Sequence, residues 1–162
     1  MRVNDLMSRI VISTPGTTPV LEARALMQTA RIRHLLVVDD GRLQGIVTDR
    51  DIRLNLPSPA TSLSVWELNH LLARLTVAKV MTRNVIVIDP GRDAREAARL
   101  MIDHKIGALP VLDGERLLGI ITETDLLRAF VEAPDSAAEP RPSLGRPPTI
   151  QAGLVAPATT KR

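Results

Sequence analysis

The most distinctive chemistry in this sequence is a Thr followed three residues later by an Asp, a pattern that occurs twice. Thr48 precedes Asp51, and Thr122 precedes Asp125. Where such a Thr begins a helix, its hydroxyl and the nearby backbone N–H groups form a site for an anion. The Asp, one turn further on, can accept hydrogen bonds from a vicinal diol. Together these groups suit a phosphorylated ribose.

The same pattern also has a purely structural explanation. A Thr with an acidic residue three positions later is a capping box, in which each side chain satisfies a backbone N–H of the other residue. A single occurrence favours capping, whereas two occurrences, each after a Gly-containing apolar run, favour a ligand site. Both interpretations stay open at this level.

Other residues that could do chemistry are few. His34, His70 and His104 lack the spacing of metal ligands, and the chain has no Cys. His34 opens an apolar segment, so we expect a structural role for it, with lining of a pocket as the alternative. Arg33 and Arg50 flank the ends of apolar segments, where a guanidinium can meet a phosphate or simply remain in solvent.

Motifs of catalysis are missing from the sequence. It contains no phosphate-binding glycine loop of the Walker or dinucleotide type, no defensible Ser/His/Asp order and no cluster of carboxylates. We therefore expect a protein that is not an enzyme and requires no metal or cofactor.

The two Thr–Asp patterns belong to an internal repeat with an offset of 74 residues. The stretch 45–51 (GIVTDRD) corresponds to 119–125 (GIITETD). Outside these stretches the same offset pairs several identical residues: Val3 with Val77, Met7 with Met81, Glu22 with Glu96, and Leu26 with Leu100. Repeats of this size share a core rather than fold separately.

Hydrophobic periodicity predicts the same order in both copies: strand, helix, two strands joined as a hairpin, helix. A short helical turn at 3–7 precedes the first copy. In the first copy the expected elements are a strand at 10–12, a helix starting at Pro19, strands at 34–38 and 43–47, and a helix from Thr48 that Pro57 stops. In the second copy they are a strand at 85–88, a helix at 93–104, strands at 108–112 and 117–121, and a helix at 122–132.

The chain divides into four parts on this basis: a first unit at 1–56, a linker at 57–76, a second unit at 77–133 and a tail at 134–162. Ser64 and Glu67 have capping-box spacing, so we expect a helix in the linker, with Trp66 packed against its neighbours. The tail is rich in Pro and Ala and offers little for a core, which predicts disorder.

Composition argues against nucleic acid and membrane as partners. The sequence pI is about 10.1, but the net charge is only +3. The tail supplies +2 of that charge, with four basic against two acidic residues. Trp66 and Phe130 are the only aromatic residues, too few for stacking on single strands. No apolar run is long enough for a membrane span and no signal peptide is visible, so we expect a cytoplasmic protein.

The repeated unit resembles the CBS domain, and the pair resembles a CBS tandem, or Bateman module. The matching stretches are VNDLMSRIVIS with VAKVMTRNVIVI, and RHLLVVDDGRLQGIVTDRDI with GALPVLDGERLLGIITETDL. The linker also resembles that of small stand-alone bacterial CBS proteins of the acetoin-utilisation type. The resemblance implies an α/β (α+β) fold of two β-α-β-β-α units related by a pseudo-two-fold axis, often assembled as a homodimer.

The family's ligands are adenosine derivatives, namely AMP, ADP, ATP or S-adenosylmethionine, bound in two clefts. The resemblance implies that Asp51 and Asp125 hold ribose hydroxyls and that Thr48 and Thr122 help to hold phosphate. The base is expected against the first strand and the start of the second strand. The residues implied there are Ile12, Ile86, His34, Ala108 and Pro110, with Arg50 near the phosphates. Leu36 stands where the family pattern, like Pro110 in the second unit, has Pro.

Three functions remain open from the sequence. The first is a regulatory module that senses an adenosine derivative and signals to an unknown protein target. The second is a dimerisation scaffold whose Thr–Asp patterns only cap helices. The third is a nucleic-acid binder, which the charge distribution disfavours.

Overall fold

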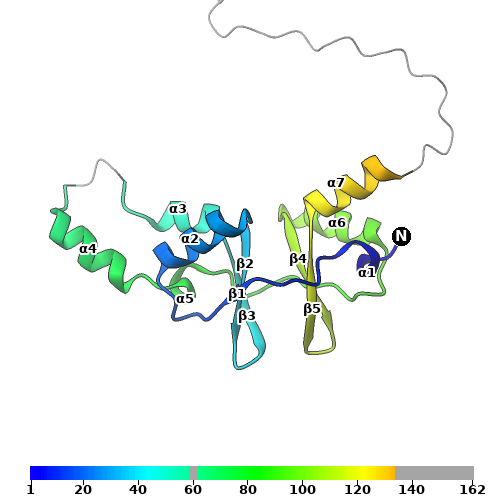
Figure 1. Cartoon of the computed structure of the whole chain (residues 1–162), viewed down its shortest axis with the longest axis horizontal. Helices are drawn as coiled ribbons and strands as arrows, with labels where there is room; N and C mark the ends of the chain where they lie inside the picture. The colour runs from blue at the N-terminus through cyan, green and yellow to red at the C-terminus, as the bar shows by residue number, and fades with distance from the viewer. Residues whose placement is uncertain (59–61, 134–162) are drawn as a thin grey trace, which may run out of the picture. The chain divides into compact units, whose positions relative to one another are not determined.

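Each repeat is built on an antiparallel hairpin (Figure 1). In the computed structural model, which describes residues 1–58 and 62–133, these hairpins are β2 (His34–Asp39) with β3 (Arg42–Thr48) and β4 (Ala108–Asp113) with β5 (Arg116–Thr122). The two registers correspond under the 74-residue offset, because His34 lies opposite Thr48 as Ala108 lies opposite Thr122. The strands follow from apolar and β-branched runs. The predicted hairpins are confirmed.

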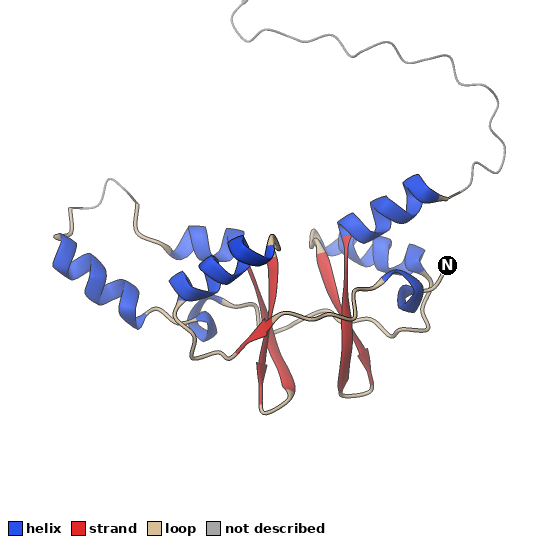
Figure 2. Ribbon diagram, viewed as in Figure 1, coloured by secondary structure: helices blue, strands red, loops and turns tan. Residues whose placement is uncertain are grey.

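Helices flank the two hairpins (Figure 2). Their bounds are α1 (Val3–Leu6), α2 (Val20–Ala30), α3 (Asp49–Asn55), α4 (Val65–Arg74), α5 (Val77–Val80), α6 (Ala94–His104) and α7 (Glu123–Glu132). These elements form one compact unit over Met1–Glu132. Pro19 is the cap residue before α2 rather than its first residue. None of the described helices is long and apolar enough to cross a membrane.

The strand predicted at 10–12 is wrong in position, and the strand predicted at 85–88 is wrong in extent, because only Ile88 pairs. The first repeat has only a two-residue strand, β1 (Ser13–Thr14), which pairs in parallel with β2. At the equivalent place the second repeat has a single bridge between Ile88 and Val111. The β-branched residues just before these pairs do not enter a sheet, because they carry the chain from one half of the unit to the other. Ile10, for example, is 84% exposed.

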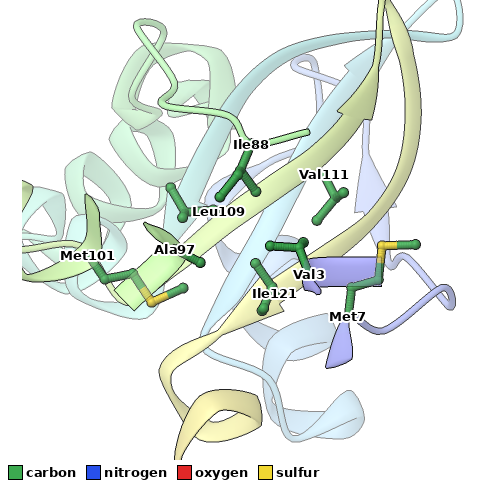
Figure 3. Close-up of a cluster of buried hydrophobic side chains, with 8 residues drawn as sticks. All are labelled: Val3, Met7, Ile88, Ala97, Met101, Leu109, Val111 and Ile121. Atoms are coloured by element: carbon green, nitrogen blue, oxygen red, sulfur yellow. The ribbon is translucent and has the colours of Figure 1, made fainter. Parts of the chain in front are cut away.

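The short helices at the start of each repeat pack in the core of the other repeat. Val3 in α1, and Met7 just after it, belong to the core around β4 and β5, together with Ile88, Ala97, Met101, Leu109, Val111 and Ile121 (Figure 3). Val77 in α5 lies in the core around β2 and β3. The residues at 1–8 therefore support the second hairpin, which the assignment of 1–56 to a single unit did not anticipate.

Two glycines permit this crossed packing. Ser8 and Ile120 exchange backbone hydrogen bonds of 2.9 and 3.0 Å, and Ile46 and Thr82 do the same at 3.0 and 2.9 Å. A Cβ on Gly119 would lie 2.5 Å from the carbonyl oxygen of Ser8. A Cβ on Gly45 would lie 2.8 Å from the carbonyl oxygen of Thr82 and even closer to the Met81 side chain. The glycine that opens each Thr–Asp stretch is thus needed where another backbone passes close by.

The linker helix α4 is largely exposed, so the expectation that Trp66 packs against its neighbours is wrong. Trp66 is 74% exposed and stacks on His70, with ring centroids 5.6 Å apart. The helix begins with a complete capping box between Ser64 and Glu67. Because this cap and the Trp–His stack are local, α4 forms without burying any of its residues. The tail at 134–162 and the linker residues 59–61 lie outside the described residues.

We expect Gly119→Ala to lower the free energy of unfolding by about 1–3 kcal/mol, since the added methyl group must displace the Ser8 backbone. Gly91→Ala is the matched control, because a Cβ there meets only a side-chain oxygen of Asp89, at 3.1 Å. Chemical denaturation of both variants measures the difference. Equal stability of the two variants would show that the close approach imposes no constraint.

Candidate functional site

Two cavities lie between the repeats, and each contains one of the Thr–Asp pairs. The larger, of about 490 Å³, is lined by Thr48 and Asp51, and we call it the Asp51 cleft. Ile86 and Ala108 of the second repeat form part of its wall. Asp49, Arg50 and Arg53 extend the lining along α3. The Asp51 cleft is therefore composite, with its Thr–Asp pair from one repeat and its apolar wall from the other.

The smaller cavity, of about 340 Å³, is built the same way with the repeats exchanged, and we call it the Asp125 cleft. Thr122 and Asp125 come from the second repeat, whereas Ile12 and His34 come from the first. The segments that cross between the halves, at 10–12 and 85–86, supply the apolar wall of each cleft.

The carboxylates of both pairs are held by the cap geometry. Oδ2 of Asp51 accepts hydrogen bonds from the backbone N–H and the hydroxyl of Thr48, at 2.8 and 2.7 Å. Oδ2 of Asp125 accepts the same two bonds from Thr122, at 2.8 and 2.7 Å. In return, each Thr hydroxyl oxygen accepts from the Asp N–H, at 3.1 and 3.4 Å. Both pairs are therefore true capping boxes.

Capping uses only one oxygen, Oδ2, of each carboxylate. Within the described part of the chain, no hydrogen bond engages Oδ1 of Asp51 or of Asp125. Each Oδ1 thus keeps its lone pairs for a ligand, while Oδ2 fixes the orientation of the group. The Thr hydroxyl, in contrast, already donates its hydrogen to the Asp. In this geometry the Thr positions the carboxylate, and capping and ligand binding are compatible rather than alternative.

His34 lines both clefts. Burial lowers its pKa, as does the neighbouring Arg33 guanidinium, while Glu123 and Asp51 act in the opposite direction. The imidazole is therefore neutral near pH 7. Gly107 makes room for this ring, because a Cβ there would lie 3.2 Å from His34 Nε2. The residue equivalent to His34 in the second repeat is Ala108, so the centre of the unit is asymmetric.

Most residues expected from the sequence at the ligand site line a cleft. Arg50 lines the Asp51 cleft. Pro110 lines neither cleft; it is buried in β4 opposite Ile120. Leu36, at the equivalent position of the first repeat, does line the Asp125 cleft. The described residues contain no group of His, Asp and Glu side chains that could hold a metal ion.

Sequence reasoning missed several polar residues of the clefts. Arg31 lines the Asp125 cleft and Lys105 the Asp51 cleft. Both follow the end of a helix with the same left-handed φ of 54°. Arg128 also lines the Asp125 cleft, one turn beyond Asp125 on α7. The 74-residue offset between Arg31 and Lys105, both basic, was a signal that could have revealed that pair.

Comparison with protein families finds the same two repeats in the chain. The model of the CBS domain family matches residues 3–58 and again residues 77–132. The CBS domain-containing protein DDB_G0289609 of Dictyostelium discoideum is 36% identical over 80% of this chain and 91% of its own length. Protein MJ1225 of Methanocaldococcus jannaschii is 34% identical over 79% of this chain, which spans only 46% of that relative.

Solved structures agree with the fold. The CBS domain pair of protein MJ0100, solved with 5′-methylthioadenosine and S-adenosyl-L-methionine, has a TM-score of 0.67 and 29% identity over 81% of this chain and 96% of that chain. A putative acetoin utilization protein (AcuB) from Vibrio cholerae has a TM-score of 0.66 and 31% identity, over 81% and 90% of the two chains. The cytosolic domain of the Mg²⁺ channel MgtE, solved with ATP, has a TM-score of 0.61 and 28% identity, over 79% and 48%.

The family model matches both repeats, and the chain covers at least 90% of the Dictyostelium relative and of the MJ0100 and AcuB structures. These matches agree with the paired hairpins described above. The chain belongs to the CBS domain family and carries two CBS domains in tandem.

Proposed function

We propose that this protein is a regulatory module that binds an adenosine derivative, such as AMP, ADP, ATP or S-adenosylmethionine, between its two CBS domains and signals to a protein partner. The observation that carries the proposal is the pair of Asp carboxylates, each fixed through Oδ2 and, among the described residues, without a hydrogen bond at Oδ1. A fixed acceptor beside an apolar wall suits a ribose diol joined to a flat base. The ligands of the MJ0100 and MgtE structures have this chemistry.

Binding in these clefts provides a route to regulation. A ligand that touches the Asp of one repeat and the apolar wall of the other contacts both repeats at once. Its affinity then depends on their relative arrangement, so binding favours one arrangement over others. We propose no catalytic step, because the Thr hydroxyls beside the carboxylates serve the helix caps.

We also propose that the module assembles as a homodimer through its helices. Leu127, Phe130 and Val131 on α7 are 65%, 79% and 80% exposed, and Ile102 on α6 is 74% exposed. Apolar side chains grouped on neighbouring helices are typical of surfaces that another protein covers. Covering them with a second copy would remove this area from water.

The ligand proposal predicts the effect of removing each carboxylate. We expect Asp125→Ala or Asp51→Ala to lower the affinity of its own cleft for an adenine nucleotide by about 1–3 kcal/mol, through loss of the hydrogen bonds to the ribose. We expect the double variant to lose measurable binding. Isothermal titration calorimetry with AMP, ATP and S-adenosylmethionine measures these changes.

Asp93→Ala is the matched control for these variants. Asp93 caps α6 by accepting from the Arg95 N–H at 2.8 Å, and it lines neither cleft. Its loss removes a helix cap without touching the site. Unchanged nucleotide binding in the Asp51→Ala, Asp125→Ala double variant would show that the two carboxylates act only as caps, whereas absence of binding by the wild-type chain would favour the scaffold function.

The dimer proposal predicts a concentration-dependent mass in sedimentation experiments. We expect a dimer at micromolar concentration and above, and a monomer for Phe130→Asp, because the charge would be buried at the interface. Val87→Asp is the control, since Val87 is 42% exposed but lies on a connecting segment rather than a helix. A wild-type chain that stays monomeric well above micromolar concentration contradicts the proposal.

A further inference from the structure

The two clefts carry different charges although one repeated unit builds both. Three acidic residues line the Asp51 cleft, namely Asp49, Asp51 and Glu123. Among the described residues that line the Asp125 cleft, Asp125 is the only acidic one. The imbalance comes from Glu123, which is the equivalent of Asp49. Its carboxylate lies over Gly107, where a Cβ would be 3.3 Å from Glu123 Oε2, and so faces the Asp51 cleft.

The basic residues accentuate this difference. Arg31, Arg33 and Arg128 line the Asp125 cleft, and none of them has an ion-pair partner within the described parts of the chain. The Asp51 cleft has Arg33, Arg50, Arg53 and Lys105. There, however, Arg53 is engaged by Asp49 at 2.8 Å. The carboxylates of Asp51 and Glu123 line the same cleft as its remaining cations, Arg33, Arg50 and Lys105.

Two changes between the repeats produce the contrast. Gly107 in the second repeat replaces Arg33 of the first and leaves room for Glu123 and His34 above it. Arg33 itself lines both clefts. Arg128 in the second repeat replaces Leu54 of the first, which lines neither cleft and is 73% exposed. The first change places an additional carboxylate, Glu123, in the Asp51 cleft, and the second places an additional guanidinium, Arg128, in the Asp125 cleft, so both make the Asp125 cleft more positive than its counterpart.

From this we infer that the Asp125 cleft is the one that selects a polyphosphate-bearing adenosine ligand, a nucleoside di- or triphosphate, with Arg128 as a residue that determines the preference. This inference rests on the proposed binding of adenosine derivatives. Guanidinium groups bind phosphate oxygens in a bidentate manner and stay charged at all relevant pH values. Carboxylates in the Asp51 cleft repel a chain of phosphates. Arg128 lies one helical turn from Asp125, so both side chains lie on the same face of α7.

The test isolates each cleft by disabling the other. Asp51→Ala leaves the Asp125 cleft as the intact site, and Asp125→Ala leaves the Asp51 cleft. Calorimetry then compares adenosine with ATP, both in the presence of EDTA so that no divalent cation masks the phosphates. We expect Asp51→Ala to bind ATP at least about tenfold more tightly than adenosine, with a preference that shrinks as salt rises. We expect a smaller preference in Asp125→Ala.

A second set of variants tests Arg128 itself, in the Asp51→Ala background. Arg128→Gln should weaken ATP binding about tenfold and leave adenosine binding unchanged, because only the phosphates lose a partner. Arg99→Gln is the matched control. It removes an exposed Arg from another helix, α6, outside both clefts, and should change neither affinity.

The outcomes separate the inference from the proposed function. If the ATP preference is equal or greater in Asp125→Ala, or if Arg128→Gln weakens adenosine and ATP alike, the charge-based assignment is wrong while the module still binds adenosine derivatives. If the wild-type chain binds neither adenosine nor ATP nor S-adenosylmethionine, the proposed function and this inference fall together.

Discussion

The close passage of backbone over Gly45 and Gly119 is the contact on which the rest of the structure depends. At these two points the segments around Ser8 and Thr82 lie against the hairpin of the opposite repeat and exchange backbone hydrogen bonds with it. Because of this crossing, Val3 and Val77 each pack in the core of the other repeat. The crossing also places residues 10–12 and 85–86 between the two repeats, where they line the two clefts. One steric condition, the missing Cβ, thus underlies both the shared core and the composite sites.

The Thr–Asp pairs form helix caps, and the binding role proposed for them uses the same residues. A capping box needs one carboxylate oxygen, and a carboxylate has two. The cap orders the side chain before any ligand arrives, so a ligand does not have to restrain it. The sequence predicts that the Thr hydroxyl helps to hold phosphate. In the structure, however, this hydroxyl donates its hydrogen to the Asp carboxylate. Under the proposed function, phosphate recognition would therefore fall to the arginines and the lysine that line the clefts.

Much of the fold could be predicted from the sequence, because local signals determine it. Apolar runs ended by Asp40–Gly41 and Asp113–Gly114 give hairpins, and both glycines adopt the positive φ that the turns require. The first strands were misplaced because β-branched residues also suit an extended connection that lines a cleft. Trp66 was expected to be packed because it is large and apolar, but a capped helix with its own Trp–His stack needs no neighbour.

The candidate site was predictable in its residues but not in its pairing. Identical residues at equivalent positions, such as Val3 with Val77 and Met7 with Met81, fit either core equally well. No property of a single repeat tells which hairpin its leading helix will contact. The sequence did not identify the arginines that line the clefts, for a related reason. An isolated Arg31 or Arg128 looks like an ordinary solvent-exposed residue until the crossing brings the other repeat beside it.

The crossed packing imposes an order on folding during synthesis. Val3 and Met7 are made before their partners Leu109, Val111 and Ile121, which are among the last residues of the compact unit. The core around β2 and β3 is complete once Val77 has emerged. The segment around Val3 and Met7 therefore remains undocked while the core around β2 and β3 assembles. A segment made before both hairpins is therefore buried only after the second hairpin has been made, and its docking completes the core around that hairpin.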